Sequence, residues 1–347
     1  MIVIKKIFLS IILSILFSLS VINKIFIKAN EINDTAKSTI LMDIDNNRIL
    51  YENNIHEKHY TASIAKILTC IVAIENGDLN KVCIVDEKTI NQVGSSIYLK
   101  LGDKVYLKDL LYGMMLRSGN DAAYLISTSV SNTLDEFVLL MNKTAKKIKM
   151  YNSYFENPSG LDETTKNYST AYDMALLMSY AMKNETFREI VSTSSYNCTT
   201  INNNKFYFNN KHKLVKSNKY CTGGKTGYTE LAKRTLVTTF SKDGINVVTV
   251  TFNCGNDWNL HEQLFEYAIN NYESKTFINQ GILDYDMINY EVTPIIYEDV
   301  KYIIKNDEKS YCVIELLNKV NNESIIGIIK LYINNKIVKE VFIYRYY

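Results

Sequence analysis

The first hydrophobic pattern after the N-terminal region alternates as in a β-hairpin and then changes to a helical spacing. Residues 39–44 and 49–51 are apolar runs separated by the turn residues Asp45, Asn46 and Asn47, which predicts two paired strands. Apolar residues then recur at helical spacing from Ile67 to Ile74, and Gly77 stands where a helix end is expected.

Two further segments carry helix signals. An apolar stripe over residues 134–148 begins with acidic residues and ends with lysines, as the helix dipole favours, so we interpret the lysine run as a solvated helix face. Thr170 and Asp173 form a capping-box pattern before an apolar segment that reaches residue 182.

Strand patterns return after residue 220. Residues 223–228, 234–241 and 245–253 read as strands, and 262–270 as a helix that lies back on them. Strands at both ends of this region with helices between them predict one sheet built from distant parts of the chain.

From about residue 276 the chain consists of short β-type runs separated by Asn, Asp and Glu turns. They cover residues 295–296, 300–304, 312–317, 325–333 and 337–344. This predicts a small all-β domain over residues 276–347 with no chemistry of its own, after a main domain over residues 30–275.

Residues 1–29 resemble a targeting segment. Lys5 and Lys6 precede an apolar run over residues 7–22, which matches a secretory signal and is short for a membrane span. The cleavage site around Ala29 is poor, so an uncleaved N-terminal anchor remains an alternative. Either reading predicts an extracytoplasmic protein, secreted or associated with the cell envelope.

Composition narrows the class of protein. The chain has 347 residues, 47% of them apolar, which suits a folded protein of two domains. A formal charge of +2 argues against a nucleic-acid partner. None of the six cysteines forms a C-x-x-C pair, so we expect no metal site and mostly free, small core cysteines.

The chemistry is carried by three short motifs. Ser63 and Lys66 form S-x-x-K, whose spacing places both side chains on one helix face, where the amine can take the hydroxyl proton. Ser118 and Asn120 form S-x-N, which also suits an ordinary helix start. Lys225-Thr226-Gly227 heads a strand pair, and its alternative reading is a plain turn. Each motif is weak alone, but the three in this order are specific.

Together the motifs resemble the serine D-alanyl-D-alanine carboxypeptidases, the low-molecular-weight penicillin-binding proteins. The resemblance runs from about residue 36 to 347. It rests on the following segments: YTASIAKILT at 60–69, LRSGNDAA at 116–123, NPSGLD at 157–162, STAYDMA at 169–175 and GGKTGYT at 223–229. Residues 94–102, and Asp257-Trp258-Asn259 with His261, are similar to a Gram-positive, sporulation-associated branch.

The resemblance implies a fold, a reaction and roles for the site residues. The fold is α/β (α+β), a transpeptidase/β-lactamase-like domain with an antiparallel sheet and a helical subdomain, followed by a β-rich domain. The reaction removes the terminal D-alanine from peptidoglycan pentapeptides through an acyl-enzyme on Ser63, needs no cofactor or metal, and is inhibited by β-lactam antibiotics. The implied roles are Ser63 as nucleophile, Lys66 as general base, Ser118 as proton relay, Asn120 on the substrate amide, Lys225, Thr226 and Gly227 at the substrate's terminal carboxylate and backbone, and the backbone N–H groups of Ser63 and Tyr228 as oxyanion hole.

The sequence departs from the family pattern at two positions. Ala232-Lys233 stands where the family often has Ala-Gly, which places a bulky charged residue near a tight strand turn. His212 falls where some members carry a substrate-facing polar residue, and we interpret it as structural. Many relatives end in an amphipathic membrane helix, whereas this sequence ends in a strand pattern, so any membrane contact is expected through the N-terminal segment.

Two other functions stay open at this point. A class A β-lactamase shares the three motifs but needs a glutamate in a Glu-x-x-Leu-Asn loop, and Glu156, Asp162 and Glu163 do not fit that pattern. A wall-binding protein without activity is the non-enzymatic alternative, suggested mainly by Lys233.

Overall fold

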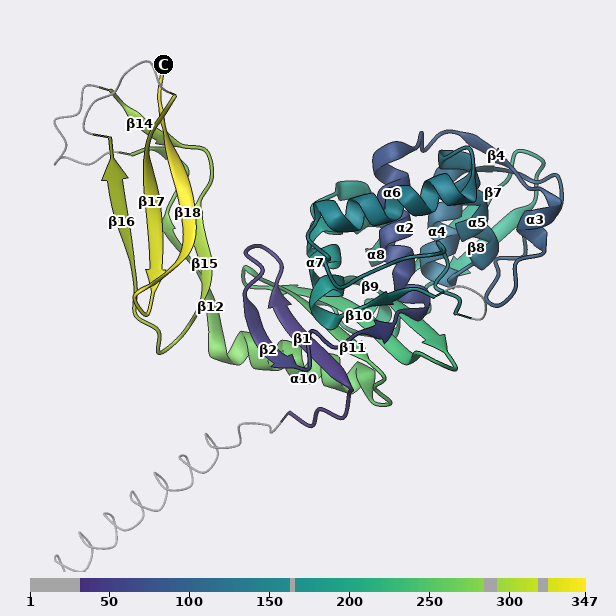
Figure 1. Cartoon of the computed structure of the whole chain (residues 1–347), viewed down its shortest axis with the longest axis horizontal. Helices are drawn as coiled ribbons and strands as arrows, with labels where there is room; N and C mark the ends of the chain where they lie inside the picture. Colours follow the sequence, from purple (N-terminus) through teal and green to yellow (C-terminus); the bar gives the residue numbers. More distant parts are fainter. Residues whose placement is uncertain (1–31, 163–165, 284–291, 318–323) are drawn as a thin grey trace, which may run out of the picture. The chain divides into compact units, whose positions relative to one another are not determined.

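The structure is a computed structural model that describes residues 32–162, 166–283, 292–317 and 324–347 (Figure 1). The chain divides into two compact units, Met1–Asp34 and Thr35–Tyr347. The predicted export segment lies outside the described residues. Within the described part of the chain, no helix has both the length and the apolar character needed to cross a membrane.

A five-stranded antiparallel sheet forms the centre of the larger unit, in the order β2-β1-β11-β10-β9. Its strands are β1 (Ser38–Asp43), β2 (Ile49–Asn53), β9 (Cys221–Thr229), β10 (Lys233–Lys242) and β11 (Ile245–Phe252). Ser38 pairs with Phe252 and Asp43 with Val247, so β1 is buried between β2 and β11. This confirms the prediction of one sheet made from both ends of the domain.

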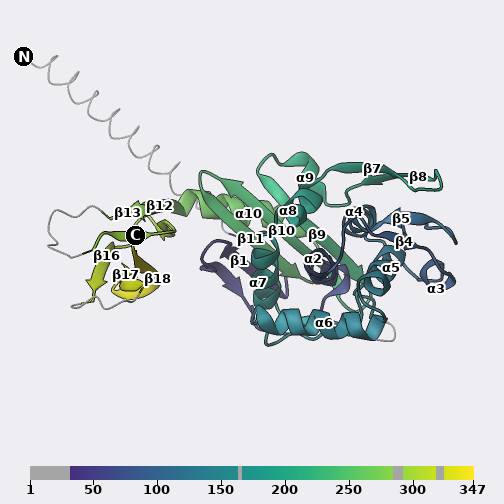
Figure 2. The ribbon, with the colours of Figure 1, turned by 90° about the horizontal axis from the view of Figure 1, so that it is seen from above.

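Helices cover the sheet and form a lobe beside it. In both views α7 and α10 lie on opposite faces of the sheet (Figures 1 and 2). The lobe surrounds α2, whose first eight residues are all buried. The longer helices are α2 (Lys66–Asn76), α4 (Leu107–Arg117), α5 (Asn120–Val130), α6 (Leu134–Lys147), α7 (Ala171–Ala181), α8 (Glu185–Ser192) and α10 (Asp257–Asn271).

Local helix signals are largely confirmed. The Thr170 side chain accepts a hydrogen bond from the Asp173 N–H at 3.1 Å, as a capping residue should. Gly77 follows the last residue of α2, but its backbone is extended (φ −108°) and not left-handed. An added Cβ at Gly77 would lie 2.8 Å from the Ala73 carbonyl oxygen and 2.7 Å from the Leu107 side chain, so close packing and not turn geometry favours glycine there.

Several short elements carried no clear sequence signal. They are the helices η1 (Ala62–Ala65), α3 (Glu87–Ile90) and α9 (Lys213–Ser217), and the strand pairs β3 (His59–Tyr60) with β6 (Tyr168–Ser169), β4 (Val82–Ile84) with β5 (Lys104–Tyr106), and β7 (Ser195–Thr199) with β8 (Lys205–Asn209). The second S-x-N match, Ser195-Tyr196-Asn197, lies in β7 and pairs with β8.

The C-terminal region is β-structured, as predicted. β12 (Tyr272–Ile278) directly follows α10 and pairs with β15 (Val300–Lys305). The remaining strands form a sheet in the order β13-β14-β18-β17-β16, comprising Gly281–Ile282, Pro294–Ile296, Lys336–Arg345, Ile325–Ile333 and Ser310–Leu316. Its core is aliphatic, with Ile326, Ile329 and Ile343 fully buried.

All six cysteines are free thiols, as expected, and Cys70, Cys83 and Cys254 are buried. Burial raises the pKa of the Cys70 thiol, so this residue behaves as a small apolar side chain.

The backbone conformation at Lys233 explains why the family often has glycine at this position. Lys233 begins β10 opposite Thr229 and adopts a left-handed conformation (φ 57°), which only glycine adopts without steric cost. Its ammonium lies 3.3 Å from the Glu230 carboxylate on an exposed surface. The Ala-Gly of the family pattern is therefore a turn requirement, which this chain meets with a strained lysine.

Replacing Lys233 with glycine is expected to stabilise the protein by about 1 kcal/mol because it relieves this conformation. Chemical denaturation of wild type, Lys233→Gly and Lys233→Ala measures the effect. Alanine removes the same charge but keeps the strain, so an equal gain from alanine would contradict the backbone explanation.

Candidate active site

Ser63 and Lys66 lie at the start of the buried helix α2. Ser63 belongs to the 3₁₀ turn η1 and Lys66 is the first residue of α2, so the three-residue spacing brings the side chains together. The Lys66 Nζ lies 3.1 Å from the Ser63 Oγ. Ala62, just before the serine, is held at φ 46°, a strained conformation of the kind that clusters at functional sites.

The surroundings of Lys66 favour a neutral amine. Its side chain is fully buried, and the Nζ donates to the Asn120 Oδ1 at 2.7 Å and to the Ser159 carbonyl. A neutral amine has two N–H donors, which these two acceptors use, and one lone pair, which is left for the hydroxyl proton of Ser63. Burial, and then the positive charge of Lys225, hold the pKa of Lys66 well below its ordinary value.

Ser118 and Lys225 form the second half of the cluster. Ser118 sits between α4 and α5 in a left-handed conformation (φ 67°), so it is not the capping residue of α5. Lys225 donates to the Ser118 Oγ at 3.0 Å and to the Thr226 carbonyl at 2.8 Å. Burial, and then Lys211, lower the pKa of Lys225 to about 7.

The structure thus brings together residues that are 55 and 107 positions apart in the chain. Ser63, Ser118, Thr226, Gly227 and Tyr228 line one cleft of about 530 Å³. Lys66 and Lys225 lie beneath it, buried to 0% and 2% exposure. An added Cβ on Gly227 would lie 2.9 Å from the Ser63 N, so glycine allows β9 to approach the serine.

Asn120 has a different immediate contact from the predicted one. Its amide is 3% exposed, accepts from Lys66 and donates to the Val93 carbonyl at 2.7 Å. Both ends of the side chain are therefore engaged within the protein, and its contact with substrate stays a prediction.

His212 is structural, as interpreted. It is 1% exposed, and its Nε2 lies 3.0 Å from the Oγ1 of Thr238, a residue of β10. Burial lowers its pKa to about 3, so the imidazole is neutral.

Sequence reasoning gave no role to several residues that complete the site. The Ser159 carbonyl bonds to Lys66, and the cleft is also lined by Ser95, Lys211, Lys213, Arg234, Thr235, Asp257 and Trp258. Lys211 lies 3.3 Å from the Ser95 Oγ, and Arg234 makes a paired hydrogen bond to Asp257 at 2.8 and 3.1 Å. The cleft therefore carries a surplus of positive charge, which suits an anionic substrate.

The loop that supplies Ser159 does have a sequence signal. Asn157-Pro158-Ser159-Gly160 is rich in turn formers, and the Asn157 Oδ1 accepts from the backbone N–H groups of Ser159 and Gly160. Gly160 has φ 83°, and an added Cβ would lie 1.8 Å from the Ala62 carbonyl oxygen. Glycine is required here because the loop touches the backbone beside Ser63.

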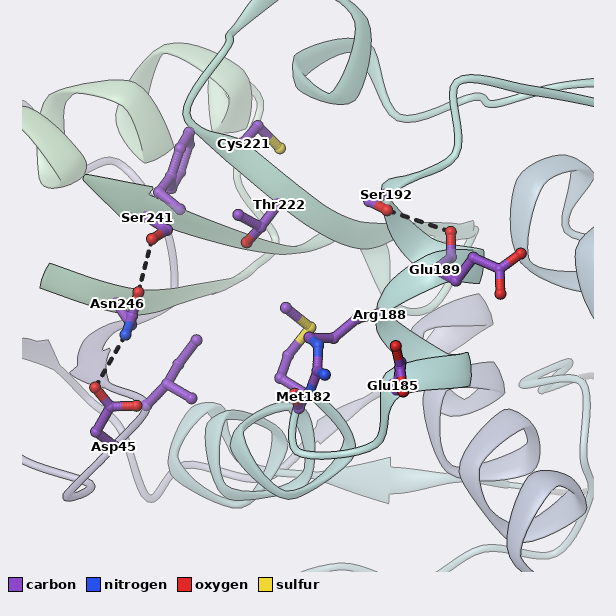
Figure 3. A pocket seen from close by; sticks show the side chains of 12 residues that line it. Asp45, Met182, Glu185, Arg188, Glu189, Ser192, Cys221, Thr222, Ser241 and Asn246 are labelled. Atoms are coloured by element: carbon purple, nitrogen blue, oxygen red, sulfur yellow. Dashed lines mark hydrogen bonds between the residues drawn. The ribbon is translucent and has the colours of Figure 1, made fainter. Parts of the chain in front are cut away.

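A larger cavity of about 630 Å³ contains none of the motif residues (Figure 3). It is lined by α8, with Glu185, Arg188 and Glu189, and by the first residues of β9. Its polar groups are engaged in hydrogen bonds, as in the chain from Ser241 through Asn246 to Asp45 and in the bond from the Tyr112 hydroxyl to Glu189. Convergence of reactive groups, and not volume, therefore identifies the smaller cleft as the candidate active site.

Comparison with known proteins identifies the family of this chain. The family described as D-alanyl-D-alanine carboxypeptidase matches residues 26–256. The chain belongs to this family. It is 31% identical over 255 residues to the D-alanyl-D-alanine carboxypeptidase DacF of Bacillus subtilis, covering 71% of this chain and 65% of that protein. It is also 31% identical over 256 residues to DacC of Escherichia coli, covering 70% of this chain and 63% of that protein.

Solved structures of the family extend the comparison to the fold. A D-alanyl-D-alanine carboxypeptidase from Mycobacterium tuberculosis superposes with a TM-score of 0.66 at 27% identity, over 70% of this chain and 95% of that one. Penicillin binding protein 5 from Haemophilus influenzae superposes with a TM-score of 0.77 at 21% identity, over 92% of this chain and 98% of that one. The second match shows the shared fold through the C-terminal strands.

Replacing Gly160 with alanine is expected to destabilise the protein by about 3 kcal/mol or more, because the Cβ overlaps a backbone oxygen that cannot move without shifting Ser63. Gly102→Ala is the matched control, since its φ of 81° is similar but no atom lies within 4 Å of the added Cβ. Thermal and urea unfolding of both variants measure the difference, and equal losses would contradict the steric explanation.

Proposed function

We propose that this protein is a serine-type carboxypeptidase that removes the terminal D-alanine from peptidoglycan stem peptides. The observation that carries the proposal is the contact between the Lys66 Nζ and the Ser63 Oγ at 3.1 Å, in a buried site beside a second lysine. This arrangement is a nucleophile with its own base.

In the first half-reaction the Ser63 hydroxyl gives its proton to the neutral Lys66 amine while its oxygen attacks the carbonyl of the penultimate D-alanine. The oxygen of the tetrahedral intermediate takes its hydrogen bonds from the Ser63 and Tyr228 backbone N–H groups. As the bond to the terminal residue breaks, Ser118 gives its hydroxyl proton to the leaving amine and receives in return the proton that Lys66 took from Ser63, which leaves Lys66 neutral again. Water then attacks the ester on Ser63 by the reverse proton path and releases the shortened peptide.

The substrate's terminal carboxylate binds near the cationic side chains of the cleft. Lys225 and Thr226 lie on the edge strand β9, and Lys211 adds a second cation from the segment before α9. Gly227 keeps the strand edge open for the peptide backbone. Asn120, with its amide oxygen on Lys66, positions the base.

A class A β-lactamase is less well supported. In the described part of the loop after α6, the Glu156 carboxylate accepts from the Lys166 N–H and Asp162 accepts from Thr229, so the bonds found for both carboxylates are to groups other than Ser63. Glu163 lies outside the described residues. The inactive wall-binding alternative has lost its main support, since Lys233 is exposed and bonds only locally to Glu230.

A role in the wall places the protein outside the cytoplasm, by secretion or by retention of residues 1–29 as an anchor. We further propose the division at residues 30–275 and 276–347, with the reaction confined to the first part, because every group of the cleft comes from it.

Ser63→Ala is expected to abolish both covalent labelling by a fluorescent penicillin and D-alanine release from a soluble pentapeptide. Ser217→Ala, an exposed serine in α9, is the control and keeps both activities. Labelling of the Ser63→Ala protein would show that another residue is the nucleophile. Rapid hydrolysis of the penicillin by the wild-type protein would favour the β-lactamase.

The pH dependence follows from the two lysines. Activity needs Lys66 neutral and Lys225 protonated, so kcat/KM rises as Lys66 loses its proton and falls as Lys225 loses its own. The pKa of Lys225 of about 7 places the falling limb well below the 10.5 of an ordinary lysine.

Lys225→Arg keeps the charge at all accessible pH values and is expected to move the falling limb upward by at least one pH unit. A pH profile of kcat/KM for both proteins measures this shift. An unchanged falling limb in the variant would assign that ionisation to a different group.

A further inference from the structure

A third cavity, distinct from the cleft and from the cavity of Figure 3, lies on the helical side of the molecule. It is a cavity of about 540 Å³, within the size range of about 300–1,000 Å³ of ligand sites. One face of α7 lines it, together with the end of α6 and the turn between β1 and β2, and α7 lies beside that end of α6 in both views (Figures 1 and 2). The α7 residues are spaced as on one helix face: Tyr172, Leu176, Ser179, Tyr180 and Lys183.

The lining of this cavity is positively charged and aromatic. Lys147, Lys149 and Lys183 line it with Tyr151, Tyr172 and Tyr180, and no lining residue is acidic. The Lys147 Nζ lies 3.1 Å from the Tyr180 hydroxyl, which in turn bonds to Glu75, so part of its charge is balanced from outside the cavity. Lys149 and Lys183 are exposed at its rim.

Ser179 supplies an independent sign of a ligand. Its side chain is 2% exposed, and among the described residues its Oγ has no hydrogen-bond partner. A buried hydroxyl without a partner costs free energy, and buried polar groups are normally paired. Because Ser179 lines the cavity, a polar group of a bound molecule is placed to complete its hydrogen bonding.

Helix-end electrostatics explain only part of this arrangement. Lys147 lies in the last turn of α6 and Lys183 just after α7. The helix dipole favours cations at both of these positions. That effect accounts for neither Lys149, beyond the end of α6, nor the unpaired hydroxyl of Ser179, nor the tyrosines.

We propose that this cavity is a second binding site for peptidoglycan, which holds a glycopeptide segment other than the one in the cleft. A sugar ring packs on the tyrosines, a stem-peptide carboxylate pairs with Lys149 and Lys183, and a sugar hydroxyl bonds to Ser179. The inference rests on the proposed function, because that function makes the wall polymer the partner. Such a site would retain the enzyme on the polymer while the cleft acts on neighbouring stem peptides.

The test is co-sedimentation of the full chain with purified peptidoglycan stripped of phosphate-containing polymers. The Lys149→Gln/Lys183→Gln protein is expected to bind at least fivefold more weakly than wild type. Lys143→Gln/Lys146→Gln removes two exposed lysines of α6 that do not line the cavity, and should change binding less than twofold. An equal loss in the control, or binding only to unstripped walls, would overturn the proposal.

Ser179→Ala provides a second readout that a purely structural residue would not give. We expect binding to fall at least twofold while the melting temperature stays the same or rises, because an unpaired hydroxyl has been removed. A lower melting temperature with unchanged binding would overturn the role of Ser179. D-alanine release from a soluble pentapeptide should be equal in all of these proteins, and its absence in wild type would instead refute the proposed function.

Discussion

The proposed chemistry of this protein depends on an environment that disfavours the charged form of the Lys66 amine. Lys66 is fully buried, and its amine bonds to Asn120, while a second buried lysine, Lys225, lies nearby and bonds to Ser118. Burial and like charge act in the same direction, so the proton is lost from Lys66 more easily than from an exposed lysine. The helix α2, the loop with Ser159, the α4–α5 junction and the edge strand β9 each contribute one part of that enclosure.

Two backbone positions make this enclosure compact. Gly160 allows the loop to approach Ala62, and Gly227 allows β9 to approach Ser63. The hydrogen bond from the Thr229 hydroxyl to Asp162 then joins this loop to β9 on the far side of the cleft. The groups around the cleft are therefore held by main-chain contacts as well as by side chains.

The strands of the sheet and the helices α2, α6, α7 and α10 could be predicted from the sequence because their apolar periods are regular, whereas α4, α5 and α8 were not predicted. The motif residues Ser63, Lys66, Ser118 and Lys225 could also be identified, since few other segments combine those residues. The short ribbons β4–β5 and β7–β8 could not, because strands of three to five residues with mixed exposure have no clear period. Lys211 and Arg234 were missed for another reason. A single cationic residue becomes part of a cleft only through the fold, and the residues beside it in the sequence form no motif that indicates this.

The order of the strands in the sheet has a consequence for biosynthesis. β1, near the beginning of the chain, lies between β2 and β11, and β11 ends at Phe252. The helix α2, which follows Ser63, is therefore synthesised long before β11, the strand that completes the sheet. The contacts between α2 and the complete sheet can form only after β11 has been made. A chain interrupted between the end of α2 and the start of β11 would contain Ser63 and Lys66 at the right spacing, but without the completed sheet. The proposed hydrolytic activity therefore requires synthesis of the chain through β11.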